Sequence, residues 1–88
     1  MSYNYKIQKP ALLTDEGQRT FLAVRDNVQR LLKLAGTVRV GEAINCDRAP
    51  SDSWELLACF DRMVELGELR EILQPGCAGQ HRMFVSGR

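Results

Sequence analysis

The chain has 88 residues, of which 44% are hydrophobic and 26% are charged. This length and composition are typical of one globular domain and exclude a disordered tail. Apolar runs are only a few residues long, so we expect neither a membrane span nor a secretory leader. A domain of this size buries roughly 60% of its unfolded surface, which leaves little room for a deep enclosed active site.

Charge is nearly balanced but unevenly distributed. Twelve Lys and Arg against eleven Asp and Glu give a net charge of +1, which excludes a blanket electrostatic attraction to nucleic acid. Residues 1–50 carry eight basic and five acidic side chains, a net of +3, whereas residues 51–88 carry four basic and six acidic side chains, a net of −2.

The thiols and the single histidine do not form a recognisable reactive site. Cys46, Cys59, Cys77 and His81 contain no closely spaced CxxC pair, so they would be an atypical zinc site. We therefore expect reduced thiols in a cytoplasmic protein, with no metal and no cofactor. A redox role for Cys77 would need a nearby cation, and an incidental surface thiol is the favoured interpretation. With neither a nucleophile motif nor a phosphate-binding glycine loop, the sequence predicts no enzyme and no small-molecule substrate.

Residues 1–13 are predicted to form an extended N-terminal arm before the main domain, residues 14–88. Tyr3, Tyr5 and Ile7 alternate with polar residues, and Pro10 lacks the main-chain donor that a longer element needs. Such an arm either packs across the domain or stays loose.

A long helix is predicted from Asp15 to Ala35. Thr14 is a good N-cap, acidic residues occupy the first turn, and Gly36 supplies a left-handed end. Three short elements are predicted after this helix. They are a small strand over 37–40, a short helix that ends near Cys46, and a polar turn over 45–51.

A second long helix is predicted from Ser53 to Leu66, followed by a β-hairpin. Asp52 and Glu55 have the spacing of a capping box, and Gly67 ends the helix. Strands over 68–73 and 80–85 flank a loop that contains glycine and proline. Seven apolar side chains are predicted to share one core: Phe21, Val28, Leu32, Leu57, Phe60, Val64 and Leu69.

Two stretches resemble the winged-helix superfamily of DNA-binding domains. FDRMVELGELREI, residues 60–72, is similar to the end of the family's third helix and the strand after it, and GTVRVGEAI, residues 36–44, is similar to the entry into its second helix. The resemblance covers residues 14–85 and implies an α+β fold, in which three helices with a short strand after the first precede a two-stranded wing. Arg39 departs from the Ser or Thr cap of many relatives, and the turn before the third helix is long.

The resemblance implies a small DNA-binding protein and transcriptional regulator, whose third helix and wing contact duplex DNA. The side chains to which the resemblance assigns contact with DNA are Arg39, Arg48, Ser51, Ser53, Arg62, Gln80, His81 and Arg82.

The predicted outer face of the third helix also supports a different function. It presents three acidic side chains and one arginine, which is unfavourable beside DNA phosphates. The alternative is a winged-helix protein-interaction module that binds a protein partner or a second copy of itself and no DNA. Trp54 would anchor the partner, unless it packs against the N-terminal arm. The partner-binding residues would be Trp54, Glu55, Asp61 and Glu65.

Overall fold

The computed structural model describes residues 3–44, 53–76 and 79–87 of this small α+β domain. Its three α-helices are α1 (Tyr5–Leu12), α2 (Asp15–Ala35) and α3 (Ser53–Glu65). The strands β1 (Val38–Arg39), β2 (Leu69–Ile72) and β3 (Met83–Ser86) form one antiparallel sheet in the order β1-β3-β2. Two 3-10 helices, η1 (Val40–Ile44) and η2 (Gly79–His81), complete the described elements.

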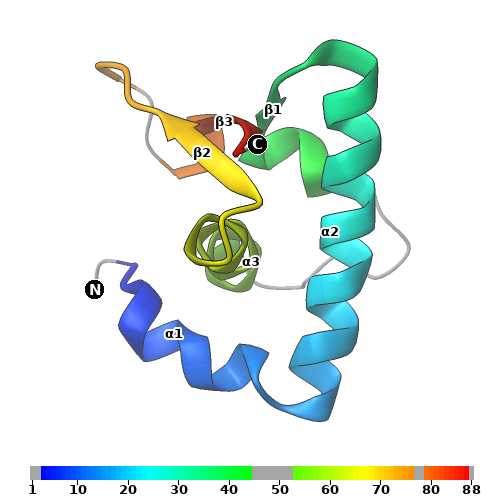
Figure 1. Ribbon diagram of the computed structural model, residues 1–88. Helices are drawn as coiled ribbons and strands as arrows, with labels where there is room; N and C mark the ends of the chain where they lie inside the picture. Colours follow the sequence, from blue (N-terminus) through cyan, green and yellow to red (C-terminus); the bar gives the residue numbers. More distant parts are fainter. Residues whose placement is uncertain (1–2, 45–52, 77–78, 88) are drawn as a thin grey trace.

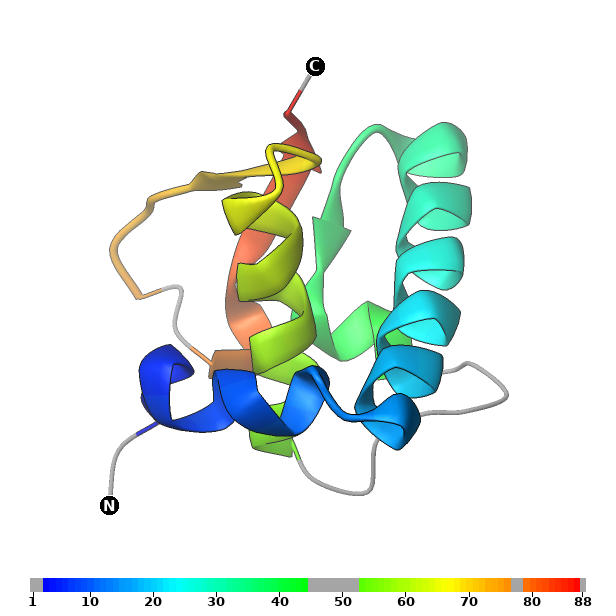
Figure 2. The same cartoon turned by 60° about the horizontal axis from the view of Figure 1, so that its bottom comes forward.

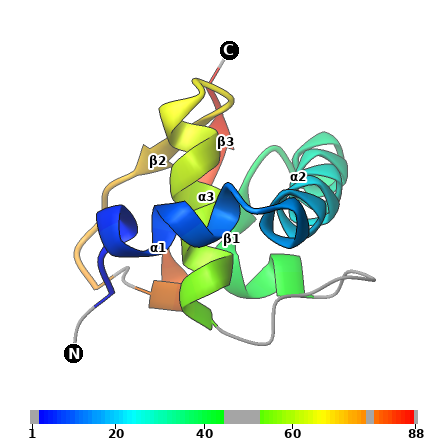
Figure 3. The ribbon, with the colours of Figure 1, turned by 90° about the horizontal axis from the view of Figure 1, so that it is seen from below.

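Helix α3 lies at the centre of the molecule, between the sheet and α1. Figure 1 shows the sheet above α3, α1 below it and α2 at one side. Figures 2 and 3 show that α1 runs crosswise over α3 rather than along it.

The predicted long helix is confirmed as α2, and its ends follow the expected chemistry. The main-chain N–H of Gly17 donates to the Thr14 hydroxyl over 3.0 Å, and Gly36 ends the helix at φ 78°. A left-handed residue of this kind is most often glycine, because a Cβ is unfavourable there. The amide of Asn27 is buried and donates to the main-chain oxygen of Ala43 over 3.1 Å, which ties α2 to η1.

The second helix and the hairpin are also confirmed, within a few residues. Helix α3 ends at Glu65 rather than Leu66, and Gly67 follows it at φ 79°. Strand β2 pairs antiparallel with β3, over shorter ranges than predicted. The sheet has a third strand because Val38 pairs with Phe84. The short helix after β1 is a 3-10 helix, and the predicted cap Asp52 and turn 45–51 lie outside the described residues.

The prediction of an extended arm is wrong for residues 5–12, which form α1. The Asn4 side chain caps this helix by accepting from the N–H of Lys6, and the helix includes Pro10. A proline there removes one main-chain hydrogen bond, and contacts with α3 stabilise the helix despite that loss. The arm does pack across the domain, which was one of the two outcomes expected for it.

The core contains five of the seven predicted side chains. Leu32 is only partly buried, and Val64 is 37% exposed, so its assignment to the core is wrong. Met63, the preceding residue, occupies the core position in the last turn of α3 and is 1% exposed. The rings of Phe60 and Phe84 pack together with their centroids 4.9 Å apart. The predicted residues that are buried are Phe21, Val28, Leu57, Phe60 and Leu69.

Candidate interaction surface

Two acidic side chains of α3 bind α1 and the residues just before it. The Tyr3 hydroxyl donates to Asp61 over 2.5 Å, and the Tyr5 hydroxyl donates to Glu65 over 2.9 Å. Lys9 forms an ion pair with the second oxygen of Glu65 at 3.0 Å. These contacts join positions more than fifty residues apart in the sequence. Two of the three carboxylates that the sequence placed on an open face, Asp61 and Glu65, are therefore engaged within the molecule.

Arg82, which directly precedes β3, also binds Asp61. Its guanidinium donates two hydrogen bonds to the Glu71 carboxylate, at 2.7 and 2.9 Å, and forms an ion pair with Asp61 at 2.8 Å. The side chain of Arg82 is 16% exposed and that of Asp61 is 18% exposed, so water screens these charges only in part. The guanidinium also lies 5.1 Å from the centre of the Phe84 ring. Arg82 thus joins β2, β3 and α3.

Proton affinities in this cluster reflect the same contacts. Burial and the hydrogen bond to Asp61 raise the pKa of Tyr3 well above its usual value. Burial and the hydrogen bond to Glu65 raise the pKa of Tyr5 to about 12. Hydrogen bonds from Lys9, and then from neighbouring donors, lower the pKa of Glu65 to about 2. Near neutral pH the hydroxyls are therefore protonated donors and the carboxylate is an ionised acceptor.

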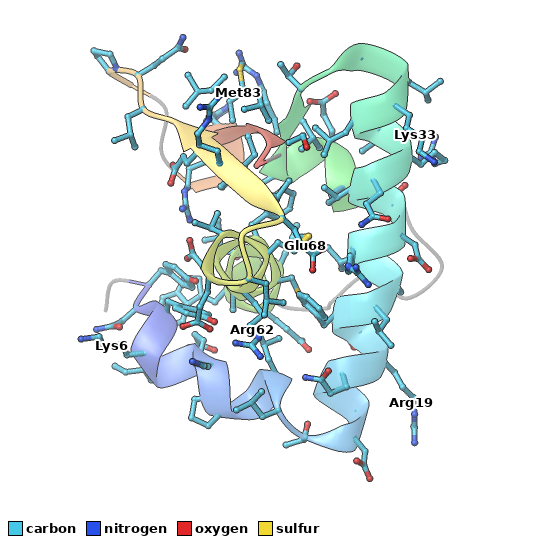
Figure 4. All side chains as sticks on the ribbon, viewed as in Figure 1. Lys6, Arg19, Lys33, Arg62, Glu68 and Met83 are labelled. Carbon is cyan, nitrogen blue, oxygen red and sulfur yellow. The ribbon has the colours of Figure 1, made fainter. Side chains whose placement is uncertain are left out.

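Helix α1 covers the part of α3 that was predicted to face solvent. Ala58, which lies between the acidic residues Glu55 and Asp61 of α3, is fully buried. Figure 4 shows Arg62 on the side of α3 that faces α1, where it forms an ion pair with Glu65. The prediction of an open acidic helix face is wrong, because the extra helix α1 packs against it.

The residues predicted to contact DNA are scattered. Arg39 is exposed on β1, His81 is exposed in η2, and Ser53 is exposed at the start of α3. Arg62 and Arg82 are held in ion pairs with acidic side chains. Gln80 belongs to η2. Arg48 and Ser51 lie outside the described residues.

The residues predicted to bind a partner are not gathered on one free surface either. Asp61 is bound by Tyr3 and Arg82, and Glu65 is bound by α1. Trp54 is partly buried and packs against the edge of the core. It lines a surface hollow of about 340 Å³ together with Val40 and Gly79. Glu55 is partly buried and lines a different groove, between α3 and the junction of α1 with α2.

The sheet presents a second surface that sequence reasoning missed. Side chains alternate along the strands, so Phe84, Val38 and Leu69 face the core and their neighbours face outward. Figure 1 shows no helix over this outward side among the described residues, and Figure 4 shows Met83 on the side of the sheet away from α3. We call this surface the outer sheet face, and it consists of Arg39, Arg70, Ile72, Met83 and Val85.

The outer sheet face is apolar in the middle and positively charged at its sides. Ile72 is paired with Met83, Val85 lies two residues further along β3, and all three are partly buried. Arg39 lies on one flanking strand and Arg70 on the other, and both are exposed. Neither forms an ion pair with a described residue. The signal that could have identified this face was the alternation of Met83 and Val85 around Phe84.

One carboxylate lies beside the outer sheet face, because that of Glu42 accepts from the main-chain N–H of Arg39 at 2.8 Å. The acidic residues in and just before β2 are directed elsewhere. Glu71 binds Arg82 on the inner side of the sheet. Glu68, which precedes β2, binds Arg25 of α2, and Figure 4 shows Glu68 on the side toward α2. The positive charge of Arg70 therefore has no compensating carboxylate within the described part of the sheet.

The other possible reactive groups form no site among the described residues. The thiol of Cys59 forms no disulfide and is buried in the core, which is the environment of a structural cysteine rather than a reactive one. Cys46 and Cys77 lie outside the described residues. Within the described ranges, no cluster of three His, Cys, Asp or Glu side chains could hold a metal ion.

Comparison with known proteins adds no assignment. No family model matches the chain, and no curated protein or solved structure is significantly similar to it. Of the helices described, none has both the length and the apolarity needed to cross a bilayer.

Proposed function

We propose that the chain is a winged-helix protein-interaction module that binds a partner protein through the outer sheet face. The order of α2, β1, η1, α3 and an antiparallel β2–β3 ribbon supports the winged-helix assignment. In that assignment α1 is an addition before the first helix of the motif.

The observation that carries the proposal is the composition of the outer sheet face. An apolar centre flanked by arginines is typical of protein interfaces, where arginine, methionine and aromatic residues are enriched. The helix that a DNA-binding relative would place in the major groove is crossed here by α1, and two of its acidic side chains, Asp61 and Glu65, are already bound.

The test compares two surface variants in partner capture. Met83→Asp places a charge in the apolar centre of the outer sheet face, and Arg19→Ala changes an exposed residue of α2 that lies outside it. We expect a partner captured by the wild-type protein to be lost with Met83→Asp and retained with Arg19→Ala. Circular dichroism checks that both variants stay folded. Equal capture by the wild type and by folded Met83→Asp would overturn the proposal.

Duplex DNA is a second candidate ligand, with transcriptional regulation as the function. It is favoured by the exposed cations Arg39 and Arg70 and by exposed His81 in the loop between the wing strands. Contacts of this kind would bind phosphates and give salt-sensitive affinity. Titration of a labelled random duplex at about 50 mM salt tests it, because non-specific binders reach roughly 10⁻⁴–10⁻⁶ M even at physiological salt. No detectable binding under these conditions would exclude this candidate.

A further inference from the structure

We propose that the partner contributes an extended acidic segment, which adds to the sheet as a new strand beside β2. This inference rests on the proposed function and deepens it, because it specifies the chemistry of the ligand at the same face.

The first argument is the position of β2 in the sheet. The strand order β1-β3-β2 leaves β2 at one edge, and no described strand pairs with its free side. The main-chain N–H and C=O groups on the free side of an edge strand can pair with an incoming chain. Proteins that bind extended peptides commonly use such an edge, with main-chain bonds for affinity and side-chain contacts for specificity.

The second argument is the charge beside that edge. Arg70 and Ile72 of β2 point outward, whereas Glu71 between them points inward and is bound by Arg82. An inward-pointing charge normally discourages strand addition, but that of Glu71 is neutralised by its ion pair. A strand added beside β2 would therefore meet one cation and one apolar side chain on the outer face.

Charge complementarity selects an acidic ligand. Arg70 lies on β2, directly beside an added strand, whereas Arg39 lies on β1, beyond β3 and roughly 10 Å further away. A second copy packed face to face would place these arginines against each other, which is unfavourable. An added strand with a carboxylate next to Arg70 and an apolar side chain next to Ile72 complements this edge of the outer sheet face.

A protein segment fits this face better than a nucleic acid backbone does. A phosphate chain beside β2 would pair with Arg70, but it would leave the apolar side chain of Ile72 against a charged backbone. An apolar side chain of a peptide could cover Ile72 instead, and the release of water favours that contact. The neighbouring Arg70 and Ile72 thus favour a peptide that alternates acidic and apolar residues.

The test is a binding titration with a defined probe. The probe is an end-blocked fluorescent octapeptide with threonine at every second position. Glutamate and valine alternate at the remaining positions, so both lie on the same face of an extended chain. Fluorescence anisotropy at about 50 mM salt compares it with the same peptide carrying lysine in place of glutamate, and with a labelled random DNA duplex. We expect the wild-type protein to bind the glutamate peptide more tightly than the lysine peptide.

Charge reversal in the protein supplies the decisive control. Arg70→Glu should weaken binding of the glutamate peptide about five- to tenfold, as loss of one exposed ion pair and its replacement by repulsion imply. The same variant should bind the lysine peptide more tightly than the wild type does. Arg19→Glu makes the same charge change on α2 and should alter neither affinity. A proline in the middle of the glutamate peptide should abolish binding, because it removes a main-chain donor.

The outcomes separate this inference from the proposed function. Equal affinity for the glutamate and lysine peptides, or no effect of Arg70→Glu, would overturn the acidic-strand inference. If Met83→Asp still abolished partner capture, the proposed function would stand without it. Tighter binding of the duplex than of either peptide, reduced equally by Arg70→Glu and Arg19→Glu, would overturn the inference in favour of general attraction to phosphate.

Discussion

Two charged regions on opposite sides of the sheet differ in how their charges are balanced. At the junction of α1, α3 and the β2–β3 hairpin, Arg82 binds the carboxylates of Glu71 and Asp61, and Asp61 also accepts from the hydroxyl of Tyr3. On the outer sheet face, the guanidinium groups of Arg39 and Arg70 form no ion pair with a described residue, although Glu42 accepts from the main-chain N–H of Arg39. The comparison indicates that the junction serves folding, and it is the reason why we propose the outer sheet face as the surface for a ligand.

The largest effect is expected from removing the cation at the junction. Arg82→Ala leaves Asp61 and Glu71 close together and poorly solvated, which should lower the free energy of unfolding by about 2–3 kcal/mol. Chemical denaturation of the wild type and of Arg82→Ala measures this difference in the free energy of unfolding. A loss of less than about 0.5 kcal/mol, the range of an ordinary surface substitution, would show that the junction does not contribute as described.

The corner between α1 and α2 provides a steric test of how α1 is held on the domain. A Cβ added at Gly17 would lie 2.0 Å from the main-chain oxygen of Ala11, so the two helices would have to separate. Gly17→Ala should therefore destabilise the protein by about 1–3 kcal/mol, although alanine is the better helix former. Thermal unfolding provides the measurement, and an increase in stability would mean that α1 does not pack at this corner.

Acid should weaken the junction through Glu65. Its pKa is about 2 in the folded protein, compared with 4.5 as the usual value, so the folded state holds its ionised form. The stabilisation is present above pH 4.5 and is lost as pH falls toward 2. The difference in melting temperature between wild type and Glu65→Gln should therefore shrink over this pH range. A constant difference would contradict the contacts of Glu65 with α1.

The smallest effect is expected on the outer sheet face. Arg70→Ala removes an exposed cation without an ion-pair partner, so the free energy of unfolding should change by no more than about 0.5 kcal/mol. The contrast with Arg82→Ala, measured under the same conditions, sharpens the comparison between the two regions. A large loss at Arg70 would show that its charge is needed for folding rather than for a ligand.

The sequence predicts elements that carry their own local signals. Thr14 and Gly36 mark the ends of α2, and Gly67 follows the end of α3, because capping chemistry depends on a few neighbouring residues. Helix α1 was missed because its local pattern, with Tyr3 and Tyr5 alternating and Pro10 near the end, favours an extended chain.

The candidate site was harder to predict, because it depends on contacts distant in sequence. The hydrogen bond from Tyr3 to Asp61 spans 58 positions, and no periodicity within α3 indicates that its acidic face is covered. Periodicity shows which residues share a face of a helix, but it does not show what lies against that face. The outer sheet face followed from strand register, which fixed Met83 and Arg70 on the same side.

The most direct test of this account is a double-mutant cycle between Tyr3 and Asp61. Tyr3→Phe and Asp61→Asn are made singly and together, and the free energy of unfolding is measured for all four proteins. A coupling of about 1 kcal/mol is predicted, since the hydroxyl donates to a partly buried carboxylate. Additive effects, with no coupling, would show that Tyr3 does not bind Asp61 and would contradict the account of an acidic helix face engaged within the molecule.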